Sequence, residues 1–187
     1  MILPIVAYGD PVLKRVSKDI DKTYPDLNGL IQNMYETMAN ANGVGLAAPQ
    51  IGKDIRIFVV DGTVLESLKD SGFRKVFINV HILEQTGEEW AYEEGCLSIP
   101  GIRESIMRPS KLKVKYVDEN FTEHVEEYEG IQARIIQHEH DHLDGKLFID
   151  YLSPLKKQLL KGKLTKISKG ETDAEYKMRF PVGGKKK

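Results

Sequence analysis

The sequence has very little cysteine and no long run of apolar residues. A single cysteine among 187 residues excludes an internal disulfide, so nothing indicates an oxidising compartment. No apolar run approaches the ~20 residues that a membrane helix needs. The apolar opening, residues 1–6, has no basic flank and is too short for the core of a signal peptide. We therefore expect a cytoplasmic protein that does not enter a membrane.

The chain also lacks an excess of charge of either sign, because its 27 basic and 28 acidic residues almost cancel. No overall field would draw it onto DNA or an anionic membrane. With 41% hydrophobic and 29% charged residues, one core can be buried and covered by polar groups. We expect a single domain over residues 1–168 and a flexible, lysine-rich tail over residues 169–187, ending in the disordered run Gly183-Gly184-Lys185-Lys186-Lys187.

Three segments show the features of helices. Apolar residues at helical spacing predict a first helix over residues 26–42. Residues 131–142 repeat apolar side chains and histidines at intervals of three and four, which aligns them on one face of a second helix that Gly145 can end. Ser153 and Pro154 provide an N-cap and a first-turn proline for a third, lysine-rich helix.

Strands are expected between the first two helices. Residues 55–60, 76–80 and 112–116 are rich in β-branched and aromatic side chains and are separated by Gly, Asp and Asn. Residues 62–75 read as a surface excursion between two of these strands. Its role is not readable from the sequence.

The most informative motif is His138-Glu139-His140-Asp141-His142 on the second helix. His138 and His142 stand one turn apart, about 5–6 Å between Cβ atoms, so both imidazoles can reach one metal ion. Glu139 can accept a proton from a metal-activated water, whose pKa the metal lowers to about 7. The alternative is a solvated, histidine-rich helix surface, and His140 points off the ligand face and is better explained as structural. The motif favours a metal-dependent hydrolase.

Two histidines leave such a site incomplete, because catalytic zinc sites usually have three protein ligands. A zinc-protease pattern that continues to a glycine and a third histidine fits Gly145 but fails at Phe148. Cys96, a soft ligand in a glycine-containing turn, can supply the third atom. Cys96 can also be a small buried hydrophobe or a nucleophile paired with a histidine. These alternatives stay open on the residues alone.

Three separate segments together resemble the signature motifs of peptide deformylases, and they occur in the expected order. They are Gly43-Val44-Gly45-Leu46-Ala47-Ala48-Pro49-Gln50, Glu94-Gly95-Cys96-Leu97-Ser98 and Gln137-His138-Glu139-His140-Asp141-His142-Leu143. The resemblance extends over about residues 4–154. It implies an α+β fold in which antiparallel sheets pack around a central metal-binding helix, with an N-terminal and a C-terminal helix.

The same resemblance implies removal of the N-terminal formyl group from the formyl-methionine of nascent polypeptides, with release of formate. Residues 1–168 would then be the catalytic domain. The metal ligands implied are Cys96, His138 and His142. Fe(II) is the metal implied by the resemblance, and zinc is the alternative, because thiolate and imidazole ligands suit both ions.

The resemblance also assigns roles beside the metal. Glu139 would act as the general acid and base, while Gln50 and the backbone N–H of Leu97 would stabilise the developing oxyanion. Glu94 and Arg103 would orient the peptide, unless they only form surface ion pairs. The positions that match the substrate pocket are Val44, Gly45 and Ile135, with plain core packing as the alternative for neighbouring Ile131.

Other functions remain compatible with the motifs. A peptidase built on the same helix would cleave internal peptide bonds, and a non-catalytic metal-binding module would hydrolyse nothing. The basic end adds one partner, because its lysines predict docking on ribosomal RNA near emerging chains. These are Lys156, Lys157, Lys161, Lys163, Lys166 and Lys169. A tail that only increases solubility is the alternative.

Overall fold

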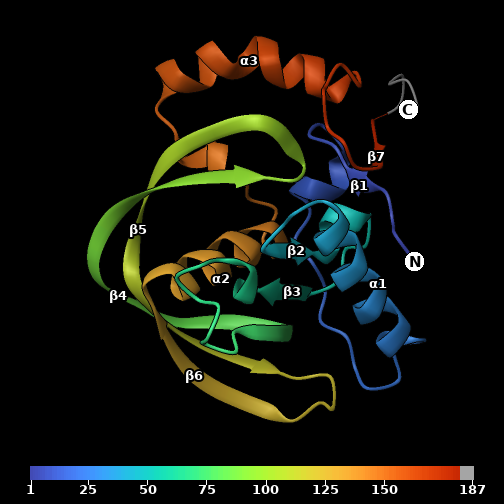
Figure 1. Cartoon of the computed structure of the whole chain (residues 1–187), viewed down its shortest axis with the longest axis vertical. Coiled ribbons are helices and arrows are strands. Elements are labelled where there is room, and N and C mark those ends of the chain that lie inside the picture. Colours follow the sequence, from blue (N-terminus) through green and yellow to red (C-terminus); the bar gives the residue numbers. More distant parts are fainter. Residues whose placement is uncertain (182–187) are drawn as a thin grey trace.

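The computed structural model describes residues 1–181 of the chain. The helices are α1 (Leu27–Asn40), α2 (Gly130–Leu143) and α3 (Pro154–Ser168). The strands are β1 (Ile5–Val6), β2 (Gly45–Ala47), β3 (Ile57–Asp61), β4 (Arg74–Cys96), β5 (Ile99–Val117), β6 (Glu123–Glu129) and β7 (Met178–Arg179). Figure 1 shows their arrangement, an α+β fold with antiparallel strands.

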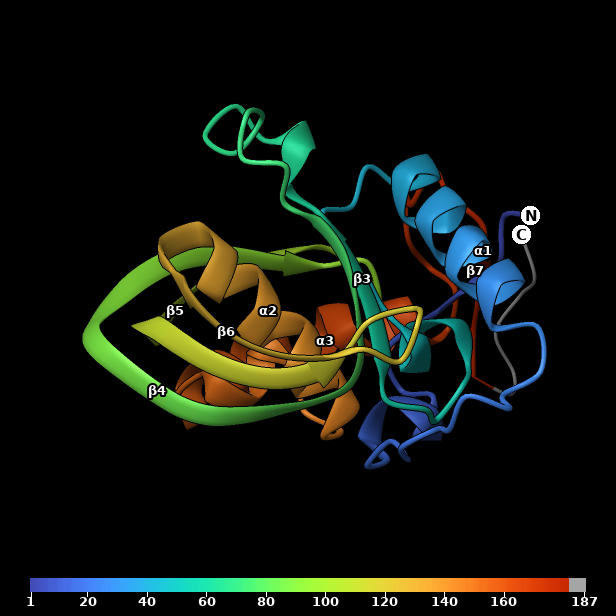
Figure 2. The ribbon, with the colours of Figure 1, turned by 90° about the horizontal axis from the view of Figure 1, so that it is seen from below.

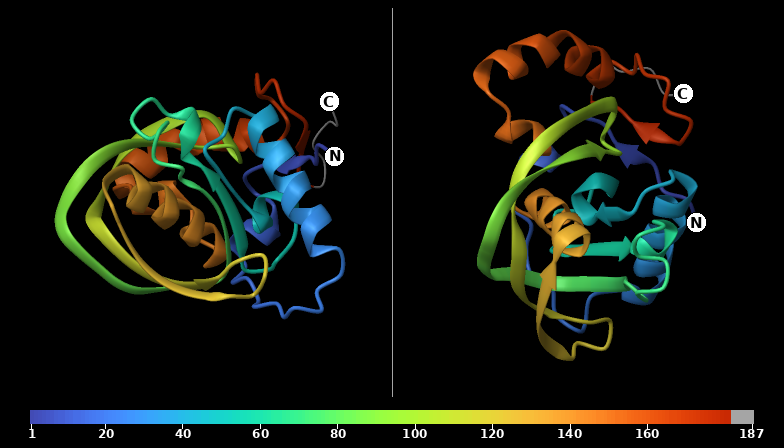
Figure 3. Two further views of the ribbon diagram at one scale, coloured as in Figure 1. Left: turned by 60° about the horizontal axis from the view of Figure 1, so that its bottom comes forward. Right: turned by 60° about the vertical axis from the view of Figure 1, so that its left-hand side comes forward.

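Strands β2 to β6 form one antiparallel sheet in the order in which they occur along the chain. The long strands β4 and β5 bend around α2 (Figure 1, Figure 2). Their register shifts at several points between residues 78 and 89 of β4, and such irregularities let a sheet curve. The bend places α2 on the concave side of the sheet, as the two further views in Figure 3 also show.

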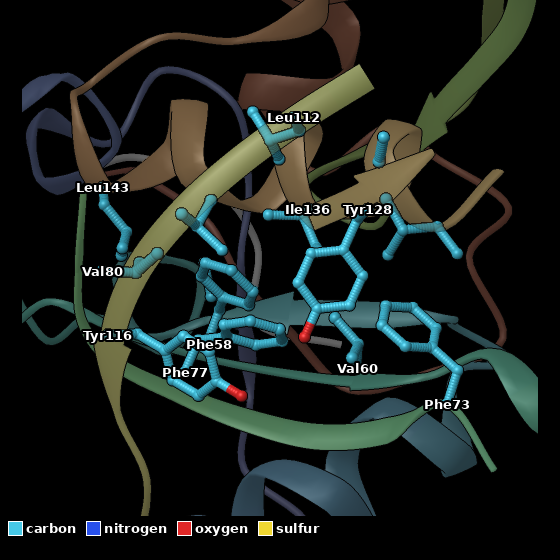
Figure 4. Packing of buried hydrophobic residues seen from close by; sticks show 14 residues of the cluster. Phe58, Val60, Phe73, Phe77, Val80, Leu112, Tyr116, Tyr128, Ile136 and Leu143 are labelled. Atoms are coloured by element: carbon cyan, nitrogen blue, oxygen red, sulfur yellow. The ribbon is translucent and has the colours of Figure 1, made fainter. Parts of the chain in front are cut away.

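Helix α2 is held against the sheet by an aromatic core (Figure 4). Phe58 on β3 stacks on Phe77 of β4 with ring centroids 4.7 Å apart, and Tyr116 of β5 lies 4.4 Å from Phe77. Ile136 and Leu143 of α2 are fully buried in the same cluster. Because burying a side chain of this size contributes about 1.5–3 kcal/mol, this core fixes the position of α2.

Strand β3 is apolar on both faces because each face is covered. Phe58 and Val60 belong to the core beneath α2, whereas Ile57 and Val59 belong to a second core. Met34 of α1 is fully buried in that second core. Successive side chains of a strand point to opposite faces, so this continuous apolar run reflects a sheet that lies between two helices.

The predicted elements largely match the observed ones. The helices predicted over residues 26–42 and 131–142 are α1 and α2, and the Ser153 hydroxyl caps α3 by accepting a hydrogen bond from the Lys156 N–H at 3.3 Å. The predicted strands overlap β3, β4 and β5, while β6 was not predicted. The excursion expected over residues 62–75 is observed over residues 62–73, because residues 74 and 75 already belong to β4. Phe73, which is 2% exposed, packs in the core at its end.

The segment after residue 168 differs from the flexible tail that the sequence indicated. Strand β7 pairs in parallel with β1, and the N–H groups of Ile5 and Ala7 donate to the carbonyls of Lys177 and Arg179 at 2.9 and 2.8 Å. Met178 is buried with the inner face of α3. A two-residue strand has no periodicity to reveal it, so the sequence pattern missed it. The domain division at residue 168 stays a prediction.

Two further expectations concern the termini and membranes. The disorder expected for Gly183-Gly184-Lys185-Lys186-Lys187 lies outside the described residues. Within residues 1–181, no helix has the length and apolar character required to cross a membrane.

Candidate active site

Helix α2 and the turn between β4 and β5 bring three ligand-type side chains together. Cys96 ends β4, and His138 and His142 lie one turn apart on α2. The Cys96 Sγ and one ring nitrogen from each histidine all lie within 4.8 Å of one another, and Sγ is 3.4 Å from the Nε2 of His142. One thiol and two imidazoles at this separation suit a single Fe(II) or zinc ion. The donor set therefore fits the metal that the sequence implied.

Glu94 orients His138. Its Oε2 lies 2.9 Å from the Nδ1 of His138, which leaves Nε2 to face the cluster, an arrangement common among metal-binding histidines. Glu94 is only 5% exposed. The surface ion pair considered for Glu94 is therefore wrong, because the residue is buried behind a metal-type histidine rather than exposed on the surface.

Two buried arginines hold Glu94. Arg108 donates from Nε and Nη2 to its two oxygens at 2.7 and 3.0 Å, and Arg134 donates from Nη1 at 2.9 Å. Burial acts to raise the pKa of Glu94, but hydrogen bonds from His138 and Arg108 outweigh it and the net shift is downward. Glu94 therefore remains an anion that can accept from His138.

The sequence reasoning did not find these arginines. Arg108 also bonds Asp141 at 2.7 Å, so it ties β5 to the helix that carries the histidines. A signal was present for Arg134, which stands four residues before His138 and thus on the same face of α2. No comparable pattern marks Arg108, since its position depends on how β5 bends over α2.

Glu139 is buried in the same site, and its Oε2 has no hydrogen-bond partner among residues 1–181. Burial raises the pKa of Glu139 to about 7. Gly45 on β2 makes room for this side chain, because a Cβ there would lie 2.3 Å from the Glu139 Oε1. A carboxyl with such a pKa can both accept and donate a proton near neutral pH.

Gln50 points its amide group at Cys96. The Ala47 N–H donates to Gln50 Oε1 at 2.9 Å, which fixes the oxygen and turns the NH₂ toward the site. That NH₂ lies 3.5 Å from Cys96 Sγ and 3.4 Å from Ser98 Oγ. Gln50 is 2% exposed, so its donor is held in position before any ligand arrives.

These residues line one cleft of about 1050 Å³. Among the positions singled out from the sequence, those on its wall are Val44, Gly45, Gln50, Cys96, Leu97, Ile135, His138 and Glu139. His142 does not line the cleft and is 1% exposed. Glu94, Ile131, Arg103, Lys163 and Lys166, named above for other roles, line the cleft too. Arg103 is exposed and its Nε bonds Glu93 at 2.8 Å, so it both forms a surface ion pair and lies where a peptide could be oriented.

Comparison with known proteins gives the family. A family model described as polypeptide deformylase matches residues 2–158. The chain belongs to the polypeptide deformylase family. A peptide deformylase of Cytophaga hutchinsonii is 57% identical over 182 residues, covering 97% of this chain and 99% of the relative. One of Christiangramia forsetii is 56% identical over 190 residues, covering 97% of each chain.

Solved structures of peptide deformylases resemble this fold. The crystal structure of a peptide deformylase from Legionella pneumophila matches with a TM-score of 0.79 and 39% identity, over 89% of this chain and 95% of that one. One from Arabidopsis thaliana, in complex with an inhibitor, matches with a TM-score of 0.81 and 29% identity, over 94% and 98%. As a member of this family, the chain is a metal-dependent hydrolase that removes the N-formyl group of nascent polypeptides.

Proposed function

We propose that Cys96, His138 and His142 hold one divalent metal ion, with Fe(II) as the working metal and zinc able to replace it. The proposal is supported by the thiol and the two imidazole nitrogens, which lie within 4.8 Å of one another. It is also supported by the Glu94 carboxylate behind His138. The metal, when bound, supplies a Lewis acid beside the carbonyl and makes water a better nucleophile.

Glu139 then moves the protons of the reaction. Its carboxylate takes a proton from the attacking water and passes it to the leaving nitrogen, so that formate and a free methionine amine result. A pKa raised by burial to about 7 suits both halves of this transfer. The observation that carries the assignment is the position of Glu139, which is buried next to His138 and lines the same cleft as Cys96 and Gln50.

Gln50 and Leu97 stabilise the charge that develops on the formyl oxygen. The Gln50 NH₂ is fixed by the bond from Ala47, and the Leu97 N–H follows directly on Cys96. Two donors that need no rearrangement act most strongly in a site that excludes water. Both are therefore proposed as oxyanion donors.

The methionine side chain of the substrate lies along Val44 and Ile135 in this proposal, since both line the cleft beside Glu139. Gly45 also lines the cleft, and its missing side chain leaves the space that the Glu139 carboxyl occupies there. Binding methionine in this pocket holds the formyl carbon beside the reacting groups. In this proposal the space beside Glu139 is too narrow for a methyl group, so a formyl carbonyl, which carries only hydrogen, is favoured over an acetyl carbonyl.

The reaction is tested by measuring formate released from N-formyl-Met-Ala peptides by the metal-loaded enzyme. We expect fast release, much slower hydrolysis of N-acetyl-Met-Ala, and no cleavage of internal peptide bonds. N-formyl-Ala peptides should react more slowly than N-formyl-Met peptides, because alanine does not fill the pocket. Cleavage of unformylated peptides, with formyl peptides left intact, would instead establish a peptidase.

Ligation by Cys96 has a separate test. Cys96→Ser should lower the metal content of protein purified without oxygen, because a hydroxyl is a harder and weaker ligand. The same samples, analysed by mass spectrometry for metals, identify iron or zinc in the wild type. A full equivalent of metal in the variant would exclude Cys96 as a required ligand.

The partner proposal concerns α3, where the six lysines singled out above are all exposed. Lys156 pairs with Glu104 at 2.7 Å, and the other exposed lysines suit the phosphates of ribosomal RNA. We propose that this side docks near emerging chains in the cytoplasm, which is where the substrate is made.

A further inference from the structure

The turn that carries Cys96 and Leu97 has an unusual geometry. Cys96 pairs with Ile99, so Leu97 and Ser98 form a two-residue hairpin connection. Such connections favour turns with positive φ, whose twist matches that of the strands. Neither Leu97 nor Ser98 has positive φ, and the next pair is Gly95 with Arg103. Residues 100–102 are therefore extra on β5, and the pairing of the two strands is irregular beside the turn.

Two contacts from outside the hairpin hold this turn. The Tyr8 N–H donates to the Ser98 carbonyl at 2.8 Å. The Tyr176 hydroxyl donates to the Leu97 carbonyl at 2.8 Å. Tyr8 follows β1 by two residues and Tyr176 precedes β7 by two residues. The pairing of β1 with β7 therefore brings both donors to the same turn.

We infer that Tyr176 is a positioning residue of the deformylation reaction, acting through the Leu97 peptide. The inference rests on the proposed oxyanion role of the Leu97 N–H. The hydrogen bond from the Tyr176 hydroxyl fixes the Leu97 carbonyl, and it thereby restricts rotation about the bond between Cα and the carbonyl carbon of Leu97. Its N–H is thereby kept aimed at the same point in the cleft.

The position of Tyr176 supports this role. Its side chain is partly buried between two apolar clusters and lines the same cleft as Leu97 and Glu139. At the Leu97 side chain, a Cβ on Gly43 would lie 2.8 Å from Leu97 Cδ1. Leu97 is thus confined from two directions. Tyr176 lies outside the matched residues 2–158, so this contact comes from a part of the chain beyond the family core.

The test compares wild-type enzyme with Tyr176→Phe, which removes one hydroxyl and keeps the ring. We expect kcat for N-formyl-Met-Ala to fall about tenfold, equivalent to about 1.4 kcal/mol of transition-state stabilisation. KM should change by less than about twofold, because ground-state binding does not use the oxyanion donor. Metal content should be unchanged. Tyr24→Phe is the matched control, since Tyr24 packs on the same cluster away from the cleft.

A second measurement does not depend on turnover. In zinc-loaded, ¹⁵N-labelled protein, the Tyr8 amide, which donates to the Ser98 carbonyl of the turn, should exchange with solvent at least about tenfold faster in Tyr176→Phe than in wild type. Amides of β3 and of α2 should exchange at wild-type rates. The Tyr24→Phe protein should show neither change.

The outcomes separate the inference from the proposed function. A wild-type kcat in Tyr176→Phe overturns the inference, and so does faster exchange throughout the chain, which would indicate a general loss of stability. If the wild type releases no formate, the proposed function fails. The exchange data then test the inference without turnover, and unchanged exchange at the Tyr8 amide shows that Tyr176 does not hold the turn.

Discussion

At the scale of single residues, the space around Glu139 matters as much as its charge. Gly45 leaves the volume that the Glu139 carboxyl occupies, and an added Cβ would lie 2.3 Å from Oε1. The atom it would meet is the end of a flexible side chain, so the fold can accommodate the methyl group while the carboxyl moves away. A methyl group added at Gly45 can therefore displace the Glu139 carboxyl without unfolding the protein.

Gly45→Ala should lower kcat/KM by at least about a hundredfold, since misplacing a proton-transfer group by about 1 Å costs that much. Metal content and the midpoint of thermal unfolding should stay close to those of the wild type. Gly162→Ala on α3 is the matched control, because a Cβ there would meet nothing within 4 Å. Wild-type kcat/KM in Gly45→Ala would show that Glu139 does not need this space.

At the scale of elements, β4, β5 and β6 are joined by a half-buried polar cluster. Lys75 of β4 lies 2.8 Å from the Oε2 of Glu126 on β6, and the Tyr116 hydroxyl of β5 donates to the same oxygen at 2.8 Å. Burial acts to raise the pKa of Glu126, but hydrogen bonds from Lys75, Tyr128 and Tyr116 outweigh it, and the pKa is lowered. This cluster fastens the edge strand to the sheet.

The lowered pKa gives stability a definite dependence on pH. Glu126 contributes stability above its unfolded pKa of about 4.3, and this contribution is lost as the pH falls through the lower pKa of the folded state. Glu126→Gln should therefore lose stability at neutral pH and lose less of it on acidification than the wild type. Urea unfolding at a series of pH values measures this.

Glu127→Gln is the control, because it removes the same charge from an exposed position on the same strand, where Glu127 lies 3.4 Å from Lys113. Its stability should fall on acidification as that of the wild type does. Equal pH dependence in Glu126→Gln and wild type would mean that the cluster does not stabilise β6.

The elements also show what sequence can and cannot predict. Helix α2 was predictable because its apolar residues and histidines repeat at helical spacing. Cys96, His138 and His142, the proposed ligands, were found in two of the three motifs, and the structure brings them together. The length of β4 and β5 was not predictable, since their exposed middle parts lack an apolar pattern and depend on pairing with each other.

Contacts between distant segments were also beyond the sequence pattern. The hydrogen bonds from Arg108 to Glu94 and Asp141 depend on the bend of β5. The bond from Tyr176 to Leu97 joins residues far apart in the chain. Local propensities do not predict which of the arginines or tyrosines in a sequence will contact such a distant partner.

At the scale of the whole molecule, charge is nearly balanced overall but uneven in its distribution. On and just after α3, the six lysines named above are exposed, whereas Lys111, Lys113 and Lys115 of β5 each lie within 4.0 Å of a glutamate on β6. The lysines of β5 are thus partly neutralised by neighbours. The α3 side is the better candidate for contact with RNA phosphates.

Reversing Lys157, Lys161 and Lys169 to glutamate should abolish co-sedimentation with ribosomes at low salt, because each lost cation removes a phosphate contact. These three do not line the cleft, so formate release should remain at the wild-type rate. Reversing the three β5 lysines instead makes the same change in net charge and should leave co-sedimentation intact. Unchanged binding by the α3 variant would reject the docking proposal.

The parallel pairing of β1 with β7 has a consequence for the order of biosynthesis. A ribosome makes β1 first and β7 after every other described helix and strand, so β1 lacks its partner until all of these have been made. The hydroxyl that holds the Leu97 carbonyl arrives with the same late segment. An enzyme that acts on nascent chains therefore gains this support of its own active-site turn only after its other described helices and strands have been made.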